Sequence, residues 1–150
     1  MKLAEALLLR VDIQKRLRQI ESRLAKNAKA QGDEPPSEHP LDLLAEFDSF
    51  NAQWEELVIR INRTNSSTEV EPGVSIADMI TKRDAVKQKI NALYKLSESA
   101  TVDLRYSRNE IIQRSSISVP EMQKMINELA KTYREIDTKL QALNWSTDLM

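Results

Sequence analysis

Two arginines interrupt helical stripes that are otherwise apolar, and a charged side chain in such a position needs a partner. Arg10 falls in the first stripe of the chain and Arg83 in a later one. Since taking a guanidinium out of water is expensive, each is expected to meet a carboxylate. Antiparallel helices bring Glu56 and Asp137 to a similar depth, so these four residues form a candidate polar core. It would act as an ion-pair set or as a site for an anion or small ligand; alternatively, each arginine extends past the helix edge into water.

A second candidate cluster lies at two predicted helix ends. Asn62 and Asn65 fall where the second helix is expected to close, and an asparagine there can cap free carbonyl groups and tolerate a left-handed backbone. Trp145 falls at the end of the last helix. Because Arg60 and Arg63 flank the two asparagines, ligand binding is the alternative to a capping role.

A third candidate is an interface on the segment 102–119, in which apolar and polar residues alternate. It contains Arg105, Tyr106 and Arg108, and arginine and tyrosine are favoured at protein interfaces. The segment is predicted to be an arm that docks on a neighbouring subunit. The alternative is a hairpin that packs on its own bundle.

Other chemistries are excluded by the composition. The 150 residues include no cysteine, one histidine (His39) and two glycines. These counts exclude disulfides, thiolate chemistry, a zinc site made of paired histidines and a glycine-rich phosphate loop. No catalytic residue, metal site or cofactor is predicted, and the protein is predicted not to be an enzyme.

Charge is unevenly distributed although the net charge is only −1. Residues 1–31 hold eight Lys or Arg against three Asp or Glu, whereas residues 33–56 hold eight Asp or Glu and no Lys or Arg. In an antiparallel helix pair the basic end of the first helix lies beside the acidic start of the second. The basic residues are therefore expected to be used within the chain, and nucleic acid is not an expected partner.

Helix breakers divide the chain into four segments with apolar residues every three or four positions. Ser75 with Asp78, and Ser118 with Pro120, are expected to start the third and fourth helices. Pro72 and Gly73 are expected to form a small turn with short extended arms. The fold class predicted is mainly all-α: one domain, 1–150, in which an antiparallel bundle carries a small β-hairpin or extended arm around 102–119. The four helices are predicted at about 2–29, 41–63, 76–101 and 120–144.

Five segments, in this order along nearly the whole chain, resemble a family of small bacterial proteins of unknown function, some of which are labelled septicolysin. The segments are MKLAEALLLR at 1–10, RINRTN at 60–65, KRDAVK at 82–87, RYSR at 105–108 and LNW at 143–145. The resemblance implies a bacterial, mainly helical protein. The label implies a cytolysin, with no residue roles to transfer.

The leading functional hypothesis is a self-associating interaction or scaffold protein, because the stripes of the first and fourth helices resemble coiled-coil seams. A homo-oligomer is expected. The alternative is a pore-forming or membrane-lytic toxin, but the most apolar run, 3–11, is too short to span a bilayer, so membrane binding is not expected. A second alternative is a small-ligand or anion binder in the bundle core. With neither a secretory signal nor a membrane-spanning segment in this sequence, a cytoplasmic location is expected.

Overall fold

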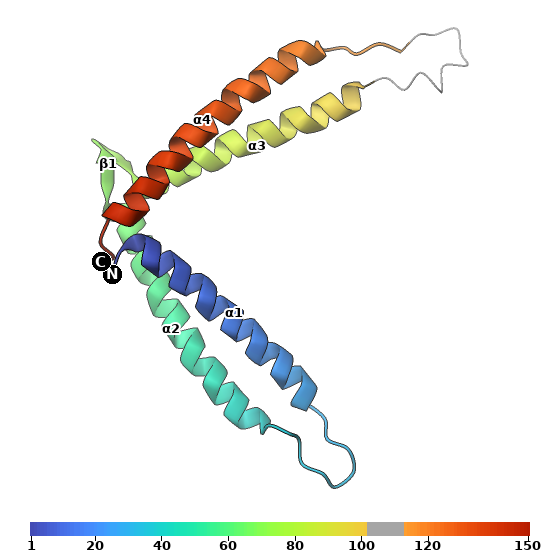
Figure 1. The fold of residues 1–150 in the computed structure, drawn as a ribbon, viewed down its shortest axis with the longest axis vertical. Coiled ribbons are helices and arrows are strands. Elements are labelled where there is room, and N and C mark those ends of the chain that lie inside the picture. The colour runs from blue at the N-terminus through green and yellow to red at the C-terminus, as the bar shows by residue number, and fades with distance from the viewer. Residues whose placement is uncertain (102–112) are drawn as a thin grey trace. The chain divides into compact units, whose positions relative to one another are not determined.

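The computed structural model describes residues 1–101 and 113–150 and contains four long helices with one small sheet (Figure 1). The elements are α1 (Leu3–Asn27), α2 (Pro40–Ser67), β1 (Glu69–Glu71), β2 (Val74–Ser75), α3 (Ile76–Ala100) and α4 (Val119–Ser146). The mainly all-α fold class is confirmed. Three helices match their predicted ranges to within two residues at each end, and α2 runs four residues further than expected.

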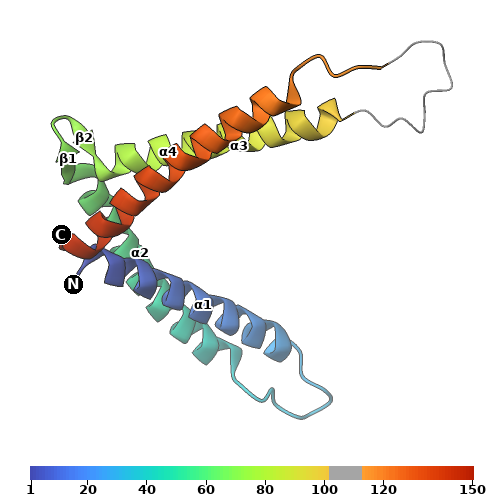
Figure 2. The same ribbon diagram turned by 45° about the horizontal axis from the view of Figure 1, so that its top comes forward.

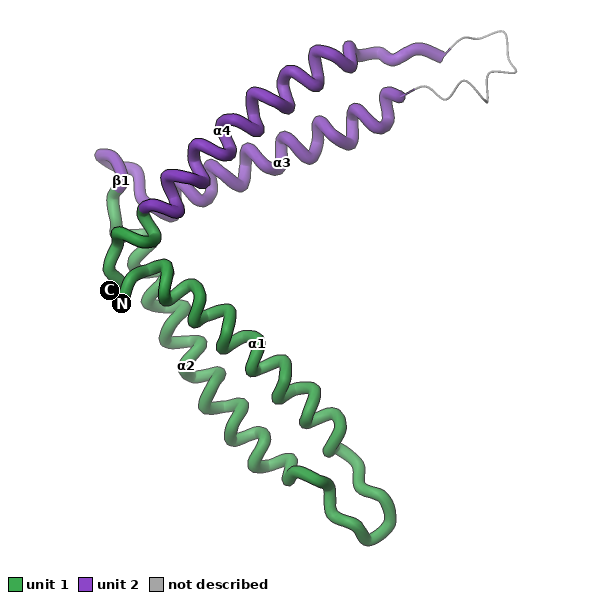
Figure 3. Tube along the Cα trace, in the orientation of Figure 1, with its two compact units in different colours: residues 1–69, 143–150 green, residues 70–142 purple. Residues whose placement is uncertain are grey.

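The chain forms two compact units (Figure 3). Unit 1 consists of residues 1–69 and 143–150, and unit 2 consists of residues 70–142. Each is described separately here. The prediction that all four helices form a single bundle domain concerns the two units together and stays a prediction.

Unit 1 is built around the hairpin of α1 and α2, which lie side by side in both ribbon views (Figures 1 and 2). Their Cα traces approach within 8 Å over much of their length. The residues that close the seam recur every three or four positions, as a helix with one buried face requires. The larger ones are Ile13, Leu17 and Ile20 on α1, and Leu43, Leu57 and Ile61 on α2. Ala6 is also buried on this side of α1, whereas the buried Ala4 lies on the opposite side of the helix.

The predicted small turn between the second and third helices is confirmed. Strands β1 and β2 pair in a two-stranded sheet, with Pro72 and Gly73 between them. Gly73 has a φ of +74°, a left-handed value that glycine adopts without strain. The turn leads directly into α3, which begins at Ile76.

A reciprocal capping box starts α3, as the spacing of Ser75 and Asp78 predicts. The Ser75 hydroxyl accepts a hydrogen bond from the Asp78 backbone N–H at 3.1 Å. The Asp78 carboxylate accepts from the Ser75 hydroxyl at 2.7 Å and from its backbone N–H at 2.8 Å. The bonds from the side chain and backbone of Ser75 lower the pKa of Asp78. The box therefore uses two donors that the helix backbone alone leaves unpaired.

The start of α4 also follows the prediction. The Ser118 hydroxyl accepts a hydrogen bond from the backbone N–H of Glu121 at 3.3 Å. The Ser118 carbonyl accepts one from the backbone N–H of Met122 at 3.0 Å. Pro120 lies in the first turn, where its missing N–H leaves no helix bond unmade. Of the predicted arm around 102–119, residues 102–112 lie outside the described residues. Residues 113–118 are not in a strand, and Val119 already belongs to α4.

Unit 2 pairs α3 with α4 more loosely than α1 pairs with α2. Few Cα atoms of the two helices approach within 8 Å of each other. Each contributes three buried apolar side chains: Ile76, Met79 and Leu93 from α3, and Met122, Ile126 and Leu140 from α4. The rest of the two apolar stripes is only half-buried.

Replacing Ser75 by alanine removes the hydroxyl of the capping box. We expect the free energy of unfolding to fall by about 1 kcal/mol, the usual effect of losing such a cap. Chemical denaturation followed by circular dichroism measures the change. Gln88→Ala, at an exposed position in the interior of α3, is the matched control and should leave stability within about 0.5 kcal/mol of wild type. Equal stability of the two variants would contradict the importance of the cap.

Candidate functional site

The structure brings together two of the four residues of the candidate polar core. In unit 2, Arg83 on α3 and Asp137 on α4 form an ion pair with 3.0 Å between Nη1 and Oδ1. The Arg83 side chain is 24% exposed and that of Asp137 is 34% exposed, so the pair lies at the edge of the seam. Asp84, the next residue along α3, also accepts from Arg83 at 3.0 Å. The pair joins the two helices of unit 2 at one register position.

Two opposing effects act on Arg83. Partial desolvation lowers the pKa of its guanidinium, while hydrogen bonds to the carboxylates of Asp137 and Asp84 raise it, and the net pKa lies above its ordinary value. The Lys87 ammonium adds a second polar link one turn further on, where it lies 5.7 Å from the centre of the Tyr133 ring. The site is therefore an ionic contact between two helices, in which each of the three guanidinium nitrogens of Arg83 donates to a carboxylate of the same chain.

Arg10 and Glu56 are placed differently. Both belong to unit 1, where Arg10 is half-buried on α1 and Glu56 is exposed on α2. Among the described residues neither takes part in an ion pair. The four-residue polar core expected from the sequence is thus represented by Arg83 and Asp137, with Arg10 and Glu56 in the other unit.

The prediction that Asn62 and Asn65 close the second helix is wrong, because α2 continues to Ser67. The backbone N–H of Thr68 donates to the carbonyl of Thr64 at 3.0 Å and ends the helix there. Asn62 is exposed within the last turns of α2. In the last turns of α2, the Thr64 and Ser67 hydroxyls donate to carbonyls four residues earlier, bonds that a helical backbone accommodates.

The side chains of this cluster differ in environment. Trp145 is 57% exposed at the end of α4. The Asn65 Oδ1 atom is buried and has no hydrogen-bond partner among the described residues, as is Nε1 of Trp54 on the same helix. The candidate interface residues Arg105, Tyr106 and Arg108 lie outside the described residues.

An arginine that the sequence analysis did not single out forms ion pairs near the end of α1 and the start of α2. Arg23 on α1 forms ion pairs with Glu38, which precedes α2, and with Glu46 on α2, the latter at 3.3 Å between Nη1 and Oε2. Asn27 adds two hydrogen bonds. Its side-chain amide N–H donates to the Arg23 carbonyl at 2.9 Å, and its side-chain oxygen accepts from the Glu38 backbone N–H at 2.9 Å. The uneven charge of the two segments indicated this type of pairing, but it named no residues. The hydrogen bonds to Arg23 lower the pKa of Glu38.

The C-terminal segment, residues 147–150, binds the start of α1 through a β-bridge between Lys2 and Asp148. The backbone N–H of Leu3 donates to the Thr147 carbonyl at 2.9 Å, and that of Leu149 donates to the Met1 carbonyl at 2.9 Å. The Lys2 ammonium lies 2.8 Å from the Asp148 carboxylate and lowers the pKa of that group. No signal in the sequence points to this contact, since its members are about 146 residues apart along the chain.

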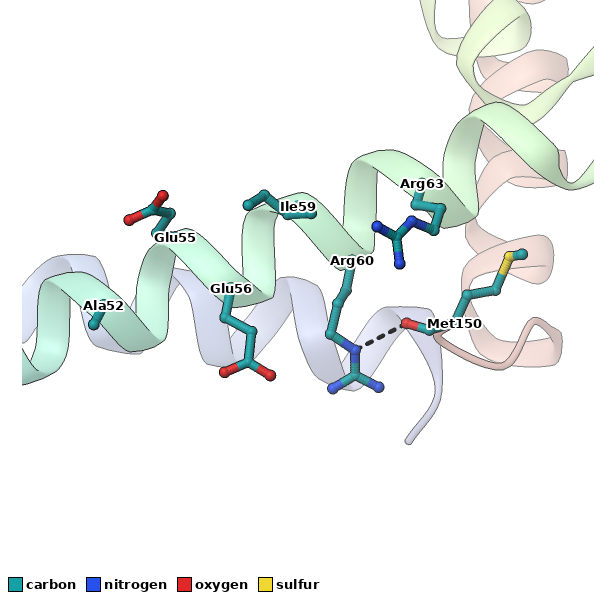
Figure 4. A pocket seen from close by; sticks show the side chains of 7 residues that line it. All are labelled: Ala52, Glu55, Glu56, Ile59, Arg60, Arg63 and Met150. Atoms are coloured by element: carbon teal, nitrogen blue, oxygen red, sulfur yellow. Dashed lines mark hydrogen bonds between the residues drawn. The ribbon is translucent and has the colours of Figure 1, made fainter.

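The same segment continues onto α2, beside a shallow cavity of about 460 Å³ (Figure 4). The Met150 backbone N–H donates to the buried Thr64 hydroxyl at 3.0 Å, and Nε of Arg60 donates to the Met150 carbonyl at 2.8 Å. Figure 4 shows that Arg60 and Glu56 extend to the side of α2 where Met150 lies, whereas Glu55 extends the opposite way. The cavity is lined by Ala52, Glu55, Glu56, Ile59, Arg60, Arg63 and Met150.

A second cavity, of about 440 Å³, lies in unit 2 beside the small sheet. Its floor includes Met79 and Ile136, and its rim includes an ion pair of 2.6 Å between Lys139 and Glu71. The hydrogen bond from Lys139 lowers the pKa of Glu71. Within residues 1–101 and 113–150 no group of three or more His, Cys, Asp or Glu residues has the arrangement of a metal site. None of the helices in these two ranges has the length and apolar character needed to cross a bilayer.

Comparison with solved structures finds a close likeness to a functionally unknown conserved protein from Corynebacterium diphtheriae, known from its crystal structure. The two are 38% identical with a TM-score of 0.93, over 100% of this chain and 99% of that one. No protein among those with curated descriptions matches the chain. Neither the description of the matching family nor that of the structural neighbour names an activity, and the cytolysin label implied by the resemblance stays a prediction. Residues 10–149 match the model described as "Family of unknown function (DUF6847)", and the chain belongs to that family.

Replacing Arg83 by methionine keeps an apolar stem and removes the bonds to Asp137 and Asp84. We expect a loss of about 1 kcal/mol in the free energy of unfolding, because the pair is only partly shielded from water. Arg10→Met is the matched control and should change stability by about 0.5 kcal/mol or less. A double-mutant cycle of Arg83→Met with Asp137→Asn, measured by chemical denaturation, should give a coupling of at least about 0.5 kcal/mol. Zero coupling would show that the cross-helix bond contributes nothing to stability.

The lowered pKa of Glu38 predicts a pH dependence. A carboxyl group whose pKa is lower in the folded state stabilises that state above its ordinary value of 4.5, and this contribution is lost as the pH falls through the lowered value. We expect the melting temperature to fall on acidification below about pH 4.5, and to fall less in Glu38→Gln. Glu34→Gln, at an exposed position in the same loop, is the control and should follow the wild-type profile. Identical profiles for Glu38→Gln and wild type would contradict a role for the Arg23 contact.

Proposed function

We propose that the protein acts by self-association, as a non-enzymatic helical interaction or scaffold protein. The observation that carries this proposal is the incomplete seam of unit 2. Two helices of 25 and 28 residues share six buried apolar side chains. The remaining large apolar residues of the two stripes are half-buried: Ile80, Val86 and Ile90 on α3, and Leu129, Tyr133 and Ile136 on α4.

A pair of helices cannot exclude water from both sides of its seam, which is why helical domains usually add further helices. Full burial of an aliphatic side chain stabilises a fold by roughly 1.5–3 kcal/mol. A further contact that buries the exposed part of each half-buried residue would therefore add to stability. Symmetric homo-oligomers are the commonest assemblies of soluble proteins. A second copy of the chain is therefore the occupant that we propose for the open side of the seam.

Large apolar residues exposed on other helices support the same proposal. On α1, Leu8 is 60% exposed and Val11 is 56% exposed, one turn apart on the same face. On α2, Ile59 is 49% exposed. Such residues are common singly on a protein surface, but their presence together with an open seam favours association.

The first test is the mass of the purified chain by light scattering, from about 100 µM to about 1 µM. We expect a mass of at least twice 17.2 kDa at the upper concentration, falling on dilution if association is weak. A mass of one chain at every concentration would remove the proposal.

A variant then locates the contact. Ile90→Lys places a charge in the half-buried seam and should lower the mass while leaving helix content unchanged. Gln88→Lys, at an exposed position of α3, adds the same charge and should keep the wild-type mass. If Ile90→Lys reduces stability without changing the mass, the chain covers its own seam. If it changes neither, water covers the seam, and both outcomes contradict the proposed contact.

A further inference from the structure

The outer face of α2 carries a pattern of residues that is complementary to itself. Seen along the helix, Ala52, Ile59 and Ser66 recur every seven residues and are all exposed, with Ile59 in the middle. They lie on the side of α2 opposite Leu57 and Ile61, the residues that α2 buries in unit 1. Residues seven apart lie two turns apart on one side of a helix, so these three form a single line along α2.

Charged residues of opposite sign lie on the two sides of Ile59 along the helix. Glu55 lies four residues before Ile59, and Arg63 lies four residues after it. Both are exposed, both line the cavity on α2 together with Ile59, and neither forms an ion pair among the described residues. Rotation by two-fold symmetry about Ile59 exchanges position 55 with position 63, so each glutamate of one copy meets an arginine of the other.

The neighbouring positions obey the same symmetry. Glu56 is exchanged with Asn62, an exposed amide that can donate a hydrogen bond to a carboxylate. Ala52 is exchanged with Ser66, and two small residues let the helix backbones approach closely at the ends of the contact. Arg60 lies to the side of the stripe, where its Nε is already bonded to the Met150 carbonyl.

From this arrangement we propose that the outer face of α2 is a two-fold interface, in which the α2 helices of two copies of the chain pack antiparallel about Ile59. This inference rests on the proposed self-association and assigns one of its contacts. In this interface, Ile59 of each copy packs on Ile59 of the other, and Glu55 of each copy pairs with Arg63 of the other. A two-fold contact uses the same patch on both subunits, and this patch is self-complementary in charge.

Charge reversal tests the pairing without disturbing the core of unit 1. Glu55→Arg alone and Arg63→Glu alone each place like charges opposite each other in the interface, so each should at least halve the associated fraction measured by light scattering. The double variant, Glu55→Arg with Arg63→Glu, restores opposite charges and should recover wild-type association. An equimolar mixture of the two single variants should also recover it, because only mixed pairs then have opposite charges at both contacts.

Cross-linking gives an independent readout, because the chain contains no cysteine. Ile59→Cys lies on the proposed axis, so mild oxidation should link two chains through a disulfide. Ser22→Cys, at an exposed position of α1 that belongs to neither proposed contact, is the control and should give far less linked product. Circular dichroism establishes that each variant keeps its helix content.

The outcomes separate this inference from the proposed function. If wild type is oligomeric but its mass is unchanged by both charge reversals, and Ile59→Cys links no faster than Ser22→Cys, the interface is overturned while self-association stands. If reversal lowers the mass but neither the double variant nor the mixture recovers it, the pairing of Glu55 with Arg63 is wrong. A wild-type mass of one chain at all concentrations overturns both proposals.

Discussion

Burial of one apolar stripe per helix is the interaction on which each unit of this protein depends. With no disulfide and no metal cluster in the described residues, the helices are held by side chains that recur every three or four positions. Unit 1 satisfies this requirement well, because its two helices lie close together along their buried stripes. Unit 2 satisfies it only in part, since its helices stand further apart and half of their stripe remains in contact with water. The difference between the two seams is the reason that we propose association.

Electrostatic contacts add to the apolar packing of the helices. Arg83 and Asp137 join α3 to α4, Arg23 joins α1 to the entrance of α2, and each contact is partly exposed. Such pairs contribute modestly to stability, but they discriminate between registers because a shift of one turn separates the charges. The same rule applies to the proposed contact between copies. There the opposite charges of Glu55 and Arg63 select the antiparallel orientation, while Ile59 supplies the apolar contact.

The termini described here contribute to the fold of unit 1 in a way that helix packing does not explain. The C-terminal segment adds a β-bridge to the start of α1 and two hydrogen bonds to α2 through Thr64 and Arg60. Three distant parts of the sequence thus meet at one end of the unit. The C-terminal segment bonds to the side of α2 that carries Arg60, whereas Ile59 on the neighbouring face is 49% exposed.

Local patterns determined the elements of this fold. Apolar spacing placed the four helices, Ser75 with Asp78 and Ser118 with Pro120 placed two of their starts, and Pro72 with Gly73 placed the turn, because each of these signals acts over a few residues. The end of α2 was missed, since Asn62 and Asn65 were expected to close the helix although its backbone stays helical through both to Ser67. Pairing between distant residues was decided only by the tertiary structure. Asp137 was anticipated as a partner for an arginine, but the choice of Arg83 over Arg10, the contacts of Arg23 and the bridge from Lys2 to Asp148 all depend on which helices lie side by side. The sequence indicates that charged residues in apolar stripes need partners, whereas only the packing of the helices decides which opposite charges come close enough to pair.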